Sequence, residues 1–129
     1  MTFGRMKIDK ADAVFSQFIR LRDGQCMRCG TYLEVNGKGM PVSLQCSHFF
    51  GRRMESVRFD EENADSLCHG CHRYWEKEDR EGYRNFKIKQ LGQERFDALV
   101  VRANTPQKKD RAMAHLYWKE RMKQVGVAV

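Results

Sequence analysis

The sequence predicts a small α+β domain whose short β core is stabilised by zinc and flanked by helices. Two C-x2-C pairs, Cys26 with Cys29 and Cys68 with Cys71, have the spacing of a four-thiolate zinc site. Apolar residues alternate between positions 32 and 46, which favours strands. Before position 24 and after position 74 they recur every three or four residues, which favours helices.

Length and charge limit the class of protein. The 129 residues predict a single domain over 1–129, with a core at about 24–80, an N-terminal helix at about 10–23 and C-terminal helices at about 83–124. The hydrophobic fraction of 41% supports only a modest core, and zinc-finger peptides gain an apparent ~10–16 kcal/mol from their metal. A net charge of +7 favours a nucleic-acid partner, although an ordinary soluble basic protein also fits that charge.

Cysteine usage predicts a reducing, cytoplasmic environment. Four of the five cysteines stand in metal-type pairs, which is unlike a disulfide scaffold. The remaining Cys46 is interpreted as a small buried hydrophobe, with a minor role as a metal ligand left open. No apolar run approaches the ~18 residues of a membrane span, and the N-terminus lacks the apolar stretch of a signal peptide, so no membrane association is expected.

The first predicted element is a helix over residues 10–23, preceded by a basic arm over residues 1–8. Asp9 is a favoured N-cap residue, and Gly24 is suited to end the helix in a left-handed conformation. The apolar positions between them follow the helical repeat: Ala11, Val14, Phe15, Phe18 and Ile19. This stripe predicts the face of the helix that enters the core.

A hairpin is expected after the first cysteine pair. Residues 32–35 suggest a strand, the run Asn-Gly-Lys-Gly at 36–39 is a strong turn signal, and residues 42–46 alternate on a returning strand. The hairpin would deliver His48 at the end of its second strand. Residues 49–65 then predict an irregular loop, and a short strand is expected around residues 64–67, after Asn63.

Helices are expected over most of the remaining chain. The run 74–80 is compatible with a helix, and a second helical face extends from Tyr83 to Gly92. A third helix is predicted over residues 94–103. Pro106 suits the first turn of a last helix through about Lys123.

Three polar residues lie at or between these elements and suit phosphodiester hydrolysis. His48 suits the general base, because an imidazole with an unperturbed pKa of ~6.5 is effective near neutral pH. Asn63 can bond backbone groups and hold a loop in place. His72, directly after the last cysteine, can ligate a divalent metal that neutralises charge on the phosphate.

The pattern resembles the HNH (ββα-metal) endonucleases that carry a four-cysteine zinc site, and more narrowly the phage NinG/Rap recombination nucleases. The resemblance covers roughly residues 12–100. It is carried by Phe18-Ile19-Arg20-Leu21-Arg22-Asp23, Cys46-Ser47-His48-Phe49, Arg58-Phe59-Asp60-Glu61-Glu62-Asn63, Cys68-x2-Cys71 and Tyr83 … Leu91-Gly92-Gln93-Glu94.

The resemblance implies a fold, a reaction and an origin. It implies a zinc-stabilised ββα-metal core with flanking helices, encoded by a phage or prophage. His48 would be the general base, Asn63 would hold the loop, and His72 would ligate a catalytic Mg²⁺ or Mn²⁺. The four paired cysteines would hold structural zinc. The products would be a 3′-hydroxyl and a 5′-phosphate, and the substrates branched recombination intermediates such as D-loops and Holliday junctions.

One position departs from the HNH pattern. Many HNH enzymes have Asp or His immediately before the base, as a further metal ligand, and this chain has Ser47. The missing carboxylate can come from four acidic residues that spacing does not distinguish: Asp60, Glu62, Glu76 and Asp79. Weak metal binding, or a preference for Mn²⁺, is the expected consequence. His72 also stands where close relatives often have Asn.

Partners and alternatives follow from the same residues. Arg52, Arg53 and Arg58 are candidates for phosphate contacts, against ordinary solvated charges. The expected partner is DNA, with branched DNA as the expected form, and a homodimer is expected because resolving a junction needs two cuts. A non-catalytic zinc module that only binds nucleic acid fits the cysteines and the charge equally well, and an RNA-directed nuclease or toxin is a third interpretation.

Overall fold

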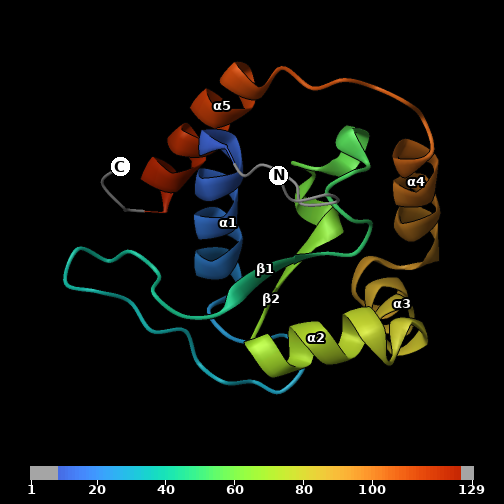
Figure 1. Ribbon diagram of the computed structural model, residues 1–129, viewed down its shortest axis with the longest axis horizontal. Coiled ribbons are helices and arrows are strands. Elements are labelled where there is room, and N and C mark those ends of the chain that lie inside the picture. Colours follow the sequence, from blue (N-terminus) through green and yellow to red (C-terminus); the bar gives the residue numbers. More distant parts are fainter. Residues whose placement is uncertain (1–8, 126–129) are drawn as a thin grey trace, which may run out of the picture.

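The computed structural model describes residues 9–125, so the basic arm predicted over residues 1–8 lies outside the described residues. The elements in chain order are α1 (Lys10–Asp23), β1 (Gln45–His48), η1 (Glu55–Val57), η2 (Glu61–Asn63), β2 (Ala64–Leu67), α2 (His69–Lys77), α3 (Arg80–Leu91), α4 (Gln93–Ala103) and α5 (Arg111–Gln124), where η marks a 3₁₀ helix. Figure 1 shows the two strands between a pair of helices, α1 and α5, and a second group, α2 to α4. The predicted α+β class is confirmed.

Helix α1 begins and ends where its sequence predicts. The Asp9 carboxylate accepts hydrogen bonds from the backbone N–H groups of Ala11 and Asp12, and the Asp12 carboxylate accepts one from the Asp9 N–H. This reciprocal capping box satisfies N–H groups that have no partner within the helix. At the other end Gly24 has a φ of 68°, a left-handed conformation that glycine adopts without a Cβ penalty.

The predicted apolar stripe of α1 packs against α5, which lies beside it in Figure 1. The ring centroids of Phe15 and Phe18 each lie 4.9 Å from that of Trp118 on α5. Ile19 and Met122 are fully buried in the same cluster. Because α1 and α5 come from opposite ends of the described chain, this cluster closes the molecule around the strands.

The predicted hairpin forms only in part: its turn lies at residues 36–39 and Val35 bridges Pro41, but β1 is not its second strand. Strand β1 pairs antiparallel with β2, in the register Gln45 to Leu67 and His48 to Ala64, and residues 32–35 form only isolated bridges. Two features explain the difference. Tyr32 is 79% exposed, so the segment at 32–35 has no core to face. Leu44 has a φ of 66°, which interrupts the extended backbone before β1.

The second core cluster lies where α2, α3 and α4 meet the strands. Trp75 of α2 stacks on Tyr83 of α3, with ring centroids 4.7 Å apart and planes 11° from parallel. Phe49 and Phe96 each place a ring edge-on in the same cluster. Aromatic contacts of this kind contribute about 0.5–1.5 kcal/mol each beyond the area that they bury.

Several helix boundaries differ from their predictions, and the largest differences are at the starts of α2 and α5. Helix α2 begins at His69, inside the second cysteine pair, because Cys68 is its N-cap and accepts a hydrogen bond from the Cys71 N–H. Helix α5 begins at Arg111 rather than near Pro106, because Asp110 caps it by accepting a bond from the Met113 N–H. Residues 106–110 therefore form a non-helical linker between α4 and α5.

Candidate functional site

The four paired cysteines come together as the sequence predicts. The Sγ atoms of Cys26, Cys29, Cys68 and Cys71 all lie within 4.8 Å of one another. Backbone N–H groups of Cys29 and Cys71 approach the Sγ atoms of Cys26 and Cys68 at 3.4 Å, as expected of two tight knuckles. Four thiolates are the donor set of a closed tetrahedral zinc site, so this cluster can hold a structural metal such as zinc.

Arg28, inside the first knuckle, was not predicted to have a role at this cluster. Its Nη1 lies 3.4 Å from the Sγ of Cys71, and its guanidinium lies 4.2 Å from the centroid of the Tyr74 ring. Burial raises the pKa of the Cys71 thiol to about 12, and the Arg28 guanidinium opposes that shift. The one signal in the sequence that could have identified this contact is the position of a basic residue between the paired cysteines.

The two predicted histidines line one hollow of about 530 Å³. It lies where the end of β1, the following loop and the outer face of α2 meet. Its lining residues are Cys46, His48, Phe49, Gly51, Arg52, Arg53, Met54, His72, Glu76 and Arg80. The structure thus brings together residues that are 24 positions apart in the sequence, as His48 and His72 are.

His48 is held by the backbone of the loop that follows it. Its Nε2 lies 2.9 Å from the carbonyl oxygen of Arg58. A carbonyl oxygen only accepts, so Nε2 carries the proton and Nδ1 is the basic nitrogen of the neutral ring. Burial lowers the pKa of His48 to about 4, although the bond to the Arg58 carbonyl opposes this shift. The imidazole is therefore neutral at physiological pH, with an unprotonated Nδ1 whose basicity is lower than that of an ordinary histidine.

The prediction that the Arg58 side chain contacts phosphate is wrong. Its side chain is fully buried, and its Nε donates to Oδ1 of Asp12 on α1 at 2.8 Å. The short helices η1 and η2 fold this loop against α1, which removes the guanidinium from solvent. Arg58 instead contributes its carbonyl oxygen to His48.

Asn63 holds the loop between β1 and β2 through three hydrogen bonds to its backbone. Its Oδ1 accepts from the Phe50 N–H at 2.9 Å, and its Nδ2 donates to the carbonyls of Phe50 and Val57 at 2.9 and 3.1 Å. The side chain is fully buried and lies outside the hollow, so its contribution to the site is to fix the loop.

His72 is oriented by a residue that the sequence did not identify. Its Nδ1 lies 2.7 Å from Oε1 of Gln45, which can only accept, so Nδ1 carries the proton and Nε2 retains its lone pair. That Nε2 lies 3.5 Å from the carboxylate of Glu76, one helical turn away. Burial lowers the pKa of His72, and Glu76 opposes the shift. An available imidazole nitrogen beside a carboxylate suits a divalent metal.

Only one of the four candidate carboxylates lies in the same hollow as His72. That carboxylate belongs to Glu76. Asp60 and Glu62 pair with Arg102 on α4, and Asp79 caps α3 by accepting from the Gly82 N–H. Ser47 points away from the hollow, where it accepts a hydrogen bond from the Tyr83 hydroxyl at 3.1 Å.

The remaining predicted residues divide between the hollow and its surroundings. Arg52 and Arg53 line it, as does Arg80, which was not predicted and which donates to the Phe49 carbonyl at 2.9 Å. Cys46 is separate from the four-cysteine cluster and packs against the α1 core, as a small hydrophobe does. Burial raises the pKa of the Cys46 thiol to about 12, so it stays protonated.

Comparison with known proteins identifies one family. A family model described as the bacteriophage lambda NinG protein matches residues 5–125. No curated protein and no solved structure matches the chain. Within residues 9–125, no helix is both long and apolar enough to cross a membrane. Because the family match spans nearly the whole sequence, the protein belongs to the bacteriophage lambda NinG family.

Proposed function

We propose that this protein is a metal-dependent DNA endonuclease of the HNH type, with His48 as its general base. The observation that carries the proposal is the 2.9 Å bond from His48 Nε2 to the Arg58 carbonyl, which leaves Nδ1 as the basic atom of a residue that lines the hollow. A neutral imidazole held rigidly in a cationic hollow is suited to take a proton from water.

The residues around His48 support complementary roles. Arg52 and Arg53 would attract the phosphate backbone to the hollow. Asn63 would keep the loop, and with it the Arg58 carbonyl, in place. His72 through Nε2 and Glu76 through its carboxylate would hold Mg²⁺ or Mn²⁺. A bound divalent ion would neutralise charge on the phosphate oxygens and the leaving group.

The proposed reaction is the hydrolysis of one phosphodiester by one water molecule. Water attacks the phosphorus while Nδ1 of His48 accepts its proton. The bond between phosphorus and the 3′-oxygen breaks, and the leaving oxygen takes a proton from solvent. The products are a 3′-hydroxyl and a 5′-phosphate, and His48 returns to its neutral form by releasing its proton to solvent.

The order of elements supports the HNH assignment. The histidine ends β1, the asparagine immediately precedes β2, and the metal-binding histidine lies in α2 directly after them. This order resembles the ββα-metal nucleases, and the four-cysteine cluster would hold β2 and α2 to the first knuckle. Membership of the NinG family favours branched recombination intermediates as the substrate. The protein would act on them in the cytoplasm of a bacterial host. A homodimer would make the two cuts that resolve a junction.

The decisive experiment compares cleavage of a labelled four-way junction, a flap, a linear duplex and an RNA duplex, each with Mg²⁺, Mn²⁺ or EDTA. Wild type is compared with His48→Ala. The matched control is His115→Ala, because His115 lies on α5 and belongs neither to the hollow that contains His48 nor to the four-cysteine cluster. We expect metal-dependent cutting that only His48→Ala abolishes, and preference for the junction.

Binding without cutting under every metal condition would instead favour the non-catalytic zinc module. Preferential cutting of the RNA duplex would favour the RNA-directed nuclease. A second variant, Glu76→Gln, tests the metal ligand separately. It should lower the affinity for Mn²⁺ in a direct binding measurement, whereas Glu78→Gln, which changes an exposed residue at the end of the same helix, should leave that affinity unchanged.

A further inference from the structure

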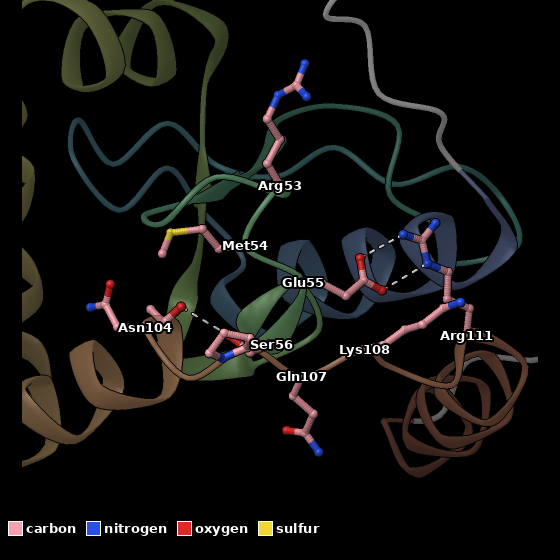
Figure 2. Close-up of a pocket in the computed structure, with 10 residues that line it drawn as sticks. Arg53, Met54, Glu55, Ser56, Asn104, Gln107, Lys108 and Arg111 are labelled. Carbon is pink, nitrogen blue, oxygen red and sulfur yellow. Dashed lines mark hydrogen bonds and ion pairs between the residues drawn. The ribbon is translucent and has the colours of Figure 1, made fainter.

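A second hollow, of about 650 Å³, lies between η1 and the linker that joins α4 to α5. Figure 2 shows its lining, with Glu55 and Ser56 on one side and Gln107 and Lys108 on the linker. The full set of lining residues also includes Arg53, Met54, Ala103, Asn104, Pro106 and Arg111. Apart from Arg53, no residue of the proposed catalytic arrangement lines this hollow.

The second hollow adjoins the one that contains His48. Arg53 and Met54 line both of them. Figure 2 shows the Arg53 side chain extending away from Gln107 and Lys108, and Arg53 belongs to the rim between the two hollows because it lines both. A chain molecule whose phosphate lies beside His48 can therefore continue over this rim into the second hollow.

The walls of the second hollow are held by contacts between distant parts of the chain. Ser56 Oγ donates to the Arg102 carbonyl at 2.7 Å, which joins η1 to the end of α4. Arg111 at the start of α5 pairs with Glu55 through Nη2 at 2.7 Å and with Asp9 through Nη1 at 2.9 Å. These contacts preform the hollow, so a ligand would not have to order it.

Charge and polarity in the hollow suit a sugar-phosphate chain. Three basic side chains line it against one acidic side chain, Glu55. Arg111 is already engaged by two carboxylates, whereas Lys108 is exposed and forms no ion pair with any residue in the described range 9–125. Met54 and Pro106 add apolar surface that a sugar or base can cover.

We propose that this hollow is a DNA-binding subsite, in which Lys108 contacts the phosphate backbone of the strand flanking the scissile phosphate. This inference rests on the proposed DNA-directed function. It adds the path that the DNA strand takes beyond the His48 hollow. The linker at residues 106–110 is then more than a connection between helices, because it carries the cation that extends the site beyond the His48 hollow.

The test measures DNA binding rather than cleavage, so that it separates this subsite from catalysis. All proteins carry His48→Ala to prevent cutting, and the probes are a labelled four-way junction and a labelled linear duplex, titrated by fluorescence anisotropy at several salt concentrations. Lys108→Glu is compared with Lys108→Arg, which retains the charge. The matched control is Lys89→Glu, since Lys89 is an exposed lysine on α3 that lines neither hollow.

We expect Lys108→Glu to weaken binding by at least about threefold and to reduce the slope of log affinity against log salt by about one, as the loss of one phosphate contact requires. Lys108→Arg should bind as its parent does, and Lys89→Glu should change affinity much less than Lys108→Glu. Equal losses in Lys108→Glu and Lys89→Glu would overturn the subsite, because they would show only a general charge effect.

Failure of the subsite and failure of the nuclease are distinguishable. If wild type cuts DNA but Lys108→Glu binds DNA as tightly as its His48→Ala parent does, the subsite is wrong and the nuclease stands. If no metal supports cutting but Lys108→Glu alone loses affinity, the subsite stands and the nuclease is wrong. Absence of DNA binding by the parent protein would overturn both.

Discussion

The Nε2 atom of His48 lies 2.9 Å from the carbonyl oxygen of Arg58, whose own side chain is anchored to α1 through Asp12. The tautomer of the proposed base thus depends on the position of a backbone carbonyl, and that position depends on a buried ion pair. Arg58 in this way links the candidate active site to the N-terminal helix, beside the direct contact between the rings of His48 and Phe15.

Loss of the Arg58 side chain should therefore destabilise the fold. Arg58→Met leaves the buried carboxylate of Asp12 without its cation, and breaking a buried ion pair typically costs about 3–5 kcal/mol. Arg95→Met is the matched control, because it removes an exposed arginine from its pair with Glu62 and should cost at most about 1 kcal/mol. Urea denaturation of the zinc-loaded proteins measures both, and equal costs would contradict the structural importance of the buried pair.

The lowered pKa of His48 predicts how stability depends on pH. The unfolded chain protonates this ring near its ordinary pKa of 6.5, but the folded chain protonates it only near pH 4. The unfolded state therefore binds more protons between these values, so stability is full above pH 6.5 and decreases as the pH falls towards 4. Between pH 7 and pH 5.5, His48 should account for roughly 1 kcal/mol of the loss in unfolding free energy.

Comparison of His48→Ala with wild type isolates that contribution, because the variant lacks this titrating group and should lose less stability over the same interval. His115→Ala should follow wild type. Parallel curves for His48→Ala and wild type would show that burial does not depress the pKa of His48. The same neutral ring predicts that kcat/KM for cleavage has no inflection near pH 6.5.

Gln45 should tune metal binding without contacting the metal. Gln45→Leu removes the acceptor that keeps the proton on Nδ1 of His72, and loss of such a supporting partner typically lowers metal affinity by about 10–100-fold. His69→Ala is the matched control, because it removes the other side chain that contacts Gln45 and leaves the bond to His72 intact. The electron paramagnetic resonance signal of unbound Mn²⁺ reports the affinity, and equal effects of the two substitutions would contradict this role.

Removal of one knuckle cysteine should abolish folding rather than merely slow a reaction. Cys68→Ser deletes one of the four clustered thiolates and the N-cap of α2, so we expect loss of bound zinc and of cooperative thermal unfolding. Cys46→Ala should retain about one zinc per chain, since Cys46 lies outside the cluster. A Cys68→Ser protein that unfolds cooperatively with unchanged zinc content would refute the four-cysteine assignment.

Local patterns in the sequence determined α1, the two knuckles and the identity of the two histidines that share the hollow. Asp9, Gly24 and the apolar stripe between them act over one or two turns of a helix, so their effect does not depend on the rest of the fold. The cysteine spacing similarly constrains each knuckle locally, and a tetrahedral ion requires the two knuckles to meet.

Only the tertiary structure decided which partner β1 takes and which arginine is buried. Arg58 and Arg52 belong to the same polar loop, yet Arg58 is buried because Asp12, 46 positions earlier, offers it a carboxylate. Likewise, β1 pairs with β2 because those strands face the core while residues 32–35 do not. Such contacts join residues far apart in sequence, where neither periodicity nor motif spacing carries information about which surfaces meet.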